Sequence, residues 1–394
     1  MKKVFLFLVP VLFFLNEGKA QWNILNSGTP NNLYAVCLTT TTTAYAVGGS
    51  GTGGSVTKTI DGGSTWSTIT TGSLDCYGVS FPDLNIGYVV GFGGTILKTI
   101  NAGDTWTPLV SGVYSNLWAV SFPEVNTGYA VGDGGTIIQT TDGVTWHTQV
   151  SNTSWSLSSV YFPNILMGYA VGANGTIVRT TNSGATWSDV YTGTTGKLNF
   201  VSFPDWNNGY VVGNSGLFLK STNAGVTWSV QTISAYDLYS VYFTDVNIGY
   251  VVTRGGHILK TIDAGASWTP QPSGTGNDLN FIVFENAGLG FTVGDNGTIL
   301  NTTNGGNVSV DEVQPGTSGL HIYPSPATSA VTLETGQVKG VKMLTVFSSS
   351  GKEILAKEMK ADLEQLDISA WPCGFYLVKV ETTQSALWGK IVKW

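Results

Sequence analysis

Short apolar runs recur along this chain, and each is bounded by Gly, Asn, Asp or Pro. The stretch 81–106, FPDLNIGYVVGFGGTILKTINAGDTW, contains three such runs and ends on a tryptophan. Runs of this length, rich in β-branched and aromatic residues, predict strands joined by tight hairpins. The tryptophan recurs every 40 or 41 residues, at Trp66, Trp106, Trp146, Trp187, Trp228 and Trp268.

Each unit of about 40 residues holds four predicted strands, which is the size of a propeller blade. The second strand of each unit carries an aromatic residue, so seven units can be counted. These residues are Tyr45, Tyr88, Tyr129, Tyr169, Tyr210, Tyr250 and Phe291. The pattern therefore predicts an all-β fold with a seven-bladed β-propeller over residues 21–310.

The missing tryptophan of the last unit indicates how the ring closes. The seventh unit has Val308 where tryptophan is due, whereas residues 22–28 match the outer-strand segments 106–112 and 268–274 in length and in the spacing of Trp and Gly. We predict that residues 22–28 supply the outer strand of the seventh blade, with Trp22 at the closure. A closed ring removes the edges that an open array exposes.

The beginning of the chain and its composition predict export. Residues 1–20 have two lysines, an apolar run and a small-residue end, as in a secretory signal peptide. No later stretch is apolar for long enough to cross a membrane. Only 11% of residues are charged and the net charge is −7, which argues against nucleic acid as a partner.

The repeat stops after residue 308, and the remaining sequence predicts a second domain. Residues 311–319 read as a linker with Pro and Gly. Residues 320–394 are richer in Lys and Glu, with alternating runs at 330–334, 343–348 and 375–380. This part predicts a small β-sandwich.

The turn before each tryptophan, as in residues 59–66 (TIDGGSTW), resembles the Asp-box SxDxGxTW of bacterial neuraminidase-type repeats. Its acidic or amide position is held by Asp61, Asn101, Asp142, Asn182, Asn223, Asp263 and Asn304. Such side chains accept hydrogen bonds from the backbone of a tight turn. We interpret these positions as structural, without a role in metal binding or catalysis.

The C-terminal domain is similar to the sorting domain of the type IX secretion system. The matching segments are 322–327 (IYPSPA), 346–348 (VFS), 366–369 (LDIS), 371–380 (WPCGFYLVKV) and 390–393 (KIVK). Ser325 stands where the family usually has Asn, and Cys373 where it has a small residue. The resemblance implies the type IX secretion machinery as a partner, passage across the outer membrane of a Gram-negative bacterium, and release or attachment at the cell surface.

The repeats themselves, with the unit GYxVGxxGTIxxTxDGGxTW, resemble the propellers of the photosystem II assembly and stability factor family. Members that act in photosystem assembly use an Arg-rich surface patch, whereas this chain has only Arg179 and Arg254. The resemblance therefore implies a scaffold more than an activity.

One position of the innermost strand suggests a ligand face. Tyr34, Tyr77, Trp118 and Tyr239 hold it in four units, with Asn199, Asn280 and Ser158 in the others. We expect this position at the mouth of the central channel, opposite the Asp-box turns, where aromatic rings and amides would hold a sugar or a peptide. The alternative is that these rings pack between blades.

Other polar residues give weaker signals. A basic residue recurs at the end of the third strand, and we interpret it as part of a solvated rim. It is present as Lys58, Lys98, Arg179, Lys220 and Lys260. The histidines and cysteines lack metal-ligand spacing, so we expect no metal and no cofactor. Cys37 and Cys76 are interpreted as buried thiols, with a disulfide as the alternative.

Together these features predict an exported, monomeric, non-catalytic propeller that binds a protein or a glycan. One alternative is an extracellular glycoside hydrolase with an unrecognised carboxylate pair. The three-Arg cluster of sialidases is excluded by the presence of only two Arg. Another alternative, from family resemblance alone, is an assembly factor or chaperone for a membrane complex.

Overall fold

The computed structural model describes residues 22–51, 53–72, 75–306, 320–335, 342–348, 352–381 and 386–393. The expected signal peptide at 1–20 and the expected linker at 311–319 lie outside these residues. The chain divides into two compact units, and the boundary falls between residues 308 and 309.

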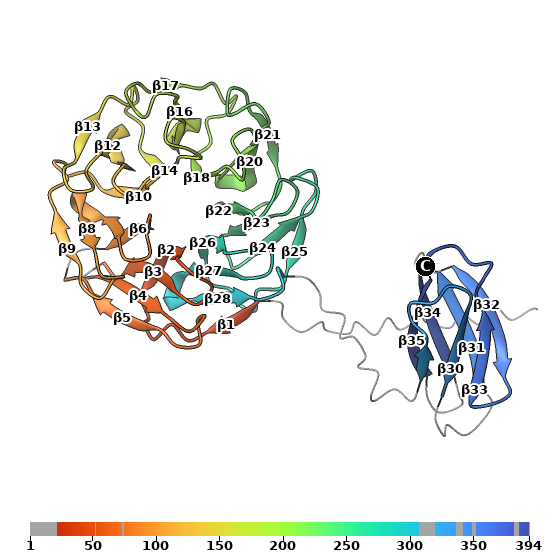
Figure 1. The fold of residues 1–394 in the computed structure, drawn as a ribbon. Helices are drawn as coiled ribbons and strands as arrows, with labels where there is room; N and C mark the ends of the chain where they lie inside the picture. Colours follow the sequence, from red (N-terminus) through yellow and green to blue (C-terminus); the bar gives the residue numbers. More distant parts are fainter. Residues whose placement is uncertain are drawn as a thin grey trace, which may run out of the picture. The chain divides into compact units, whose positions relative to one another are not determined.

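The first unit is a ring, and its described residues form seven four-stranded antiparallel sheets (Figure 1). The innermost strands are β2 (Asn32–Leu38), β6 (Cys76–Ser80), β10 (Leu117–Ser121), β14 (Leu157–Tyr161), β18 (Leu198–Ser202), β22 (Leu238–Phe243) and β26 (Leu279–Phe284). The second strands are β3 (Ala44–Gly49), β7 (Gly87–Gly91), β11 (Gly128–Gly132), β15 (Gly168–Gly172), β19 (Gly209–Gly213), β23 (Gly249–Thr253) and β27 (Gly290–Gly294).

The third strands are β4 (Gly54–Thr59), β8 (Ile96–Thr99), β12 (Ile137–Thr140), β16 (Ile177–Thr180), β20 (Leu217–Ser221), β24 (Ile258–Thr261) and β28 (Ile299–Thr302). The outermost strands are β5 (Ser67–Thr70), β9 (Thr107–Leu109), β13 (His147–Gln149), β17 (Ser188–Asp189), β21 (Ser229–Thr232), β25 (Thr269–Gln271) and, for the last blade, β1 (Asn23–Leu25). This arrangement confirms the predicted all-β propeller.

The second strand of each blade is buried along its whole length, as β7 and β11 show. Its first glycine is a steric requirement, because a Cβ atom on Gly87 would lie 2.4 Å from the ring of Phe81. The same approach recurs between Gly128 and Phe122 in the next blade. Glycine thus makes room for the phenylalanine that follows the innermost strand of its own blade.

The ring closes through the strand near the start of the chain, as predicted. Strand β1 pairs with β28 in antiparallel register, with Asn23 opposite Asn301. Trp22 is only 1% exposed, and its ring meets those of Phe284 and Tyr250 edge-on at centroid distances of 5.9 and 6.5 Å. The closure is therefore a sheet pairing backed by an aromatic cluster.

In the described residues, five blades have a short 3-10 helix between the second and third strands. These are η1 (Phe92–Gly94), η2 (Asp133–Gly135), η3 (Ala173–Gly175), η4 (Asn214–Gly216) and η5 (Asp295–Gly297). The middle residue is left-handed, with φ of 62° at Gly93 and 56° at Asn174. Glycine and asparagine tolerate this conformation best, which explains their frequency in these turns.

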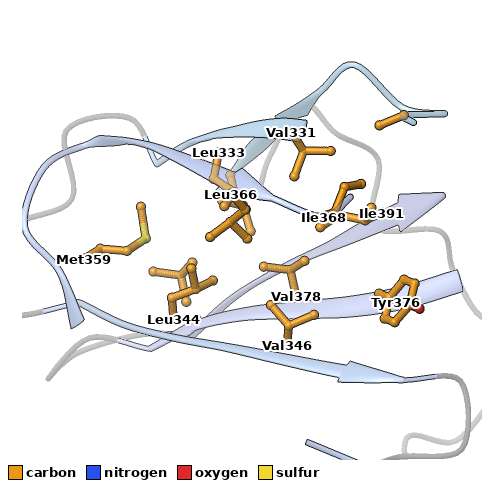
Figure 2. Close-up of a cluster of buried hydrophobic side chains, with 13 residues drawn as sticks. Val331, Leu333, Leu344, Val346, Met359, Leu366, Ile368, Tyr376, Val378 and Ile391 are labelled. Atoms are coloured by element: carbon orange, nitrogen blue, oxygen red, sulfur yellow. The ribbon is translucent and has the colours of Figure 1, made fainter. Parts of the chain in front are cut away.

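The second unit is a two-sheet sandwich, which confirms the predicted fold of the tail. One sheet has the order β29-β30-β33 and the other β32-β31-β34-β35. The strands are β29 (His321–Tyr323), β30 (Ala330–Glu334), β31 (Lys342–Ser348), β32 (Glu353–Met359), β33 (Leu363–Asp367), β34 (Gly374–Glu381) and β35 (Ala386–Lys393). Val331, Leu333 and Leu366 of the first sheet pack on Leu344 and Val378 of the second (Figure 2).

The closure gives a first prediction. Replacing Trp22 by alanine removes a buried ring from the contact between β1 and the sixth and seventh blades, so we expect a loss of about 3–5 kcal/mol in the free energy of unfolding. Chemical denaturation of the full chain measures it. Trp155, which is 50% exposed, is the matched control, and its replacement by alanine should cost below about 1 kcal/mol. Equal losses for the two variants would contradict the closure.

Candidate functional site

The six side chains singled out by the sequence lie around one end of the central channel, which we call the mouth. Each follows the first buried residue of an innermost strand, and all six line a cavity of about 430 Å³ together with Asp133, Ser156, Ser158 and Lys197. The six are Tyr34, Tyr77, Trp118, Asn199, Tyr239 and Asn280. Because the strands are antiparallel, the Asp-box turns lie at the opposite end of every blade.

Three of the aromatic rings are in consecutive contact across the first three blades. The rings of Tyr34 and Tyr77 meet edge-on at 5.4 Å, and those of Tyr77 and Trp118 are stacked at 4.4 Å. All three remain partly exposed. The rings therefore pack between blades, as the alternative interpretation expected, and also face the cavity.

The polar groups of the mouth are held in place by hydrogen bonds. Trp118 donates its indole N–H to Asp133 at 2.8 Å, and Tyr239 donates its hydroxyl to Asp278 at 3.2 Å. Asn199 donates to the side-chain oxygen of Asn214 and to the carbonyl of Leu238, both at 2.8 Å. Asn280 donates to Asp295 at 2.9 Å and to the carbonyl of Leu33 at 3.0 Å. The amides thus bridge neighbouring blades, and the mouth is preorganised.

A second ring of polar residues lies one position before the first buried residue of each innermost strand, and the sequence-based predictions did not include it. The Asn, Asp and Ser side chains at this position accept a hydrogen bond from a backbone N–H in the preceding blade, as Asp75 does from Gly51 at 2.9 Å and Asp278 from Gly255 at 2.8 Å. The fifth blade has Lys197 there, which has no acceptor. Burial, and after it the Asp278 carboxylate, raises the pKa of Tyr239 to about 12. A polar residue recurring before the apolar strand was the signal that could have found them.

The Asp-box residues form hydrogen bonds within their own turns, at the end of each blade opposite the mouth. Asp61 accepts hydrogen bonds from the backbone N–H and the hydroxyl of Thr65, at 2.9 and 2.6 Å, and from the hydroxyl of Thr59 at 2.8 Å. Asn101 accepts the equivalent backbone N–H of Thr105 at 3.0 Å. The corresponding hydrogen bonds are present at Asp142, Asn182, Asn223 and Asp263, and Asn304 accepts from the Thr302 hydroxyl.

The recurring basic residues do not form a solvated rim, so that interpretation is corrected. Lys98 and Lys260 donate to backbone carbonyls in the Asp-box turn of the next blade, Gly143 at 3.0 Å and Gly305 at 2.7 Å. Each lies over the ring of a tyrosine of its own blade, as Lys98 does over Tyr88 at 5.4 Å. Lys260 is only 7% exposed. Lys98, Lys220 and Lys260 thus join blades through backbone carbonyls, which leave no trace in the sequence. Lys58 instead pairs with the carboxylate of Asp104 in the next blade, and Arg179 contacts Tyr169 and Met167 of its own blade.

Two further features of the described residues are the state of the cysteines and the arrangement of potential metal ligands. Cys37 and Cys76 form no disulfide, and burial raises the pKa of both thiols to about 11. Among the described residues, no group of three or more His, Cys, Asp and Glu side chains is arranged to hold a metal ion. The same residues contain no helix with the length and apolar character needed to cross a membrane.

Comparison with known families supports both resemblances. Residues 321–393 match the secretion system C-terminal sorting domain. Residues 138–235 and 191–275 match the photosynthesis system II assembly factor YCF48. No curated protein sequence matches the chain significantly. The chain is thus a propeller with YCF48-like repeats and a sorting tail of the type IX secretion system.

Solved structures show the same fold. YCF48 from Cyanidioschyzon merolae is 20% identical, with a TM-score of 0.60, covering 71% of this chain and 98% of its own. A second structure, YCF48 bound to D1 peptide, is 18% identical, with a TM-score of 0.62 and coverages of 72% and 95%. PorZ of Porphyromonas gingivalis, an essential surface component of its type IX secretion system, is 12% identical, with a TM-score of 0.53 and coverages of 90% and 58%.

The Asp-box carboxylates predict a pH dependence of stability. Hydrogen bonds from Thr65 and from Ser267 lower the pKa of Asp61 and of Asp263 from 3.8 to about 2. Because the folded-state pKa is depressed, these carboxylates stabilise the fold above about pH 4, and their contribution is lost as the pH falls toward about 2. Unfolding midpoints of the full chain across this range measure the effect.

The matched variant exchanges both carboxylates for amides, Asp61→Asn with Asp263→Asn. Asn101, Asn182 and Asn223 already accept the same backbone hydrogen bond in other blades. We therefore expect stability close to wild type at pH 7 and a shallower loss between about pH 4 and 2. An equally steep loss in this variant would show that other groups govern the acid response.

Proposed function

We propose that this chain is an exported, non-catalytic propeller that binds a protein or a glycan at the mouth of its central channel. The observation that carries the proposal is the cavity of about 430 Å³ lined by four partly exposed aromatic side chains and two fixed amides. A concave surface with aromatic walls and a few oriented polar groups is the usual form of a binding site. The rings are held by stacking and hydrogen bonds, so little ordering is needed when a ligand binds.

The neighbouring structures support a binding role over a hydrolytic one. A propeller of the same fold, YCF48, is described with a D1 peptide bound, so this fold can carry a peptide ligand. The mouth carboxylates Asp133, Asp278 and Asp295 all accept hydrogen bonds from neighbouring side chains of the mouth. No specific observation favours the glycoside hydrolase alternative, and the paucity of Arg argues against the photosystem assembly role.

We propose that the protein functions outside the cell, and the sorting tail supports this. In this proposal a leader at residues 1–20 directs the chain across the inner membrane, and the tail directs it through the type IX system of a Gram-negative bacterium. The propeller is then released or attached at the cell surface, as a monomer. Its mouth would meet ligands of the extracellular medium or of the cell surface.

The mouth is tested by removing three of its rings together, with Tyr34→Ala, Trp118→Ala and Tyr239→Ala. We expect binding to an array of glycans and surface proteins to weaken at least about tenfold, because aromatic residues at the centre of binding sites contribute most of the affinity. Trp206, which is 63% exposed at the Asp-box end, is the control, and Trp206→Ala should leave binding unchanged. Unchanged binding in the triple variant would refute the mouth as the ligand face.

Deletion of residues 374–394 tests the tail. This change removes β34 and β35, two strands of the four-stranded sheet, while the propeller is a separate compact unit. We expect the truncated protein to stay inside the cell envelope, which fractionation and surface labelling would detect. Its continued appearance at the surface or in the medium would contradict export through this domain.

A further inference from the structure

The mouth carries more negative charge than its architecture requires. In the first and third blades, an amide oxygen accepts a backbone N–H of the preceding blade: Asn32 accepts from Asn296 and Asn116 accepts from Gly93, both at 2.9 Å. In the second, sixth and seventh blades a carboxylate oxygen accepts this backbone N–H instead. The nitrogen–oxygen distances are 2.9 Å for Asp75, 2.7 Å for Asp237 and 2.8 Å for Asp278. Because asparagine makes the same hydrogen bond, the fold does not need the charge.

A second position of the mouth repeats the comparison. Asn214 accepts a hydrogen bond from Asn199 at 2.8 Å, whereas Asp295 accepts the equivalent bond from Asn280 at 2.9 Å. Amide and carboxylate again perform the same structural task. Of the charged residues, Asp133 and Lys197 line the cavity itself. The charged groups that act on its tyrosines from the surrounding positions are Asp75, Asp237, Asp278 and Asp295, and one cation, Arg254.

These carboxylates act on the rings that line the cavity. Burial, and then the charges of Asp75 and Asp133 among others, raises the pKa of Tyr77. Burial and the charges of Asp75 and Asp295 likewise raise the pKa of Tyr34, against a hydrogen bond from Asn32 that lowers it. The surplus charge is therefore felt at the aromatic walls, where a ligand would sit.

We infer that the mouth selects a cationic group, and that this group is the Lys or Arg side chain of a polypeptide. The inference rests on the proposed binding function of the mouth and names its ligand class. A cation in the cavity would meet the faces of aromatic rings and nearby carboxylates together, and both attract it. The chain already uses such pairs internally, with Lys98 over Tyr88 at 5.4 Å and Lys260 over Tyr250 at 5.3 Å.

A polypeptide fits this chemistry better than a glycan does. Proteins supply isolated Lys and Arg side chains at their surface, and the carboxylates attract these cations. Neutral sugars carry no charge to be attracted, although their hydroxyls can donate hydrogen bonds, and anionic sugars are repelled. The mouth also offers the side-chain amides of Asn199 and Asn280, but both are already engaged with neighbouring blades. The charge of a ligand is therefore the property by which the mouth discriminates among ligands.

The experiment uses the full chain and a variant that removes charge but keeps an oxygen to accept each backbone N–H: Asp75→Asn, Asp237→Asn and Asp278→Asn together. The control removes the same charge at the opposite end, with Asp83→Asn, Asp205→Asn and Asp245→Asn. Asn164 and Asn286 already accept the turn hydrogen bonds at the equivalent control positions. The probes are three immobilised sets of 15-residue peptides that differ only in carrying Arg, Gln or Glu, and panels of neutral and anionic glycans.

We expect wild type and the control to bind the Arg peptides most strongly. The charge variant should bind them at least about tenfold more weakly, and its binding should depend less on salt between about 0.05 and 0.5 M. Equal binding of Arg, Gln and Glu peptides, binding of glycans alone, or an unaffected charge variant would each overturn the inference. Binding that is insensitive to the charge variant but lost in Tyr34→Ala with Trp118→Ala and Tyr239→Ala would leave the proposed function standing. Binding insensitive to both would overturn both.

Discussion

Six of the seven blades are joined to the next blade by one tyrosine of the second strand. Tyr88 stacks on Phe122 of the next blade at a centroid distance of 3.9 Å and meets the edge of Trp146 at 6.5 Å. Its hydroxyl donates to the carbonyl of Gly143 in that blade's Asp-box turn at 3.1 Å, and Lys98 donates to the same oxygen. The aromatic cluster thus buries the interface between the two blades, and the hydrogen bond to Gly143 satisfies the tyrosine hydroxyl. The Asp-box shapes the turn that presents this carbonyl, so the turn and the interface depend on each other.

The contact between the seventh and first blades lacks the tyrosine hydroxyl, because Phe291 takes its place. Trp66 still meets the ring of Phe291 at 6.2 Å. Other bonds join these two blades at the mouth, where Asn280 donates to the carbonyl of Leu33 and Asn32 accepts from Asn296. The contact between the seventh and first blades and the shape of the candidate site therefore depend on the same residues.

Much of the fold follows from the sequence because its signals are local and repeated. The spacing of the tryptophans gave the blades, and the isolated Trp22 segment gave the closing strand that pairs with β28. The clustering of Tyr34, Tyr77 and Trp118 at one mouth follows from the same symmetry. The role of Lys98 and Lys260 was missed because their partners are backbone carbonyls one blade away. The surplus charge of the mouth was missed because Asp and Asn are interchangeable until the hydrogen bond that each accepts is visible.

The point at which the ring closes lies inside the seventh blade, between its third strand and its outermost strand. Strands β26 to β28 form the larger part of this blade, and strand β1 forms the smaller part. The six blades between them have the same four-stranded construction. Duplication or loss of one 40-residue unit in the gene leaves both parts of the split blade intact. Ring size in such proteins is therefore open to evolutionary change by whole units, while the joint that closes the circle is inherited unaltered.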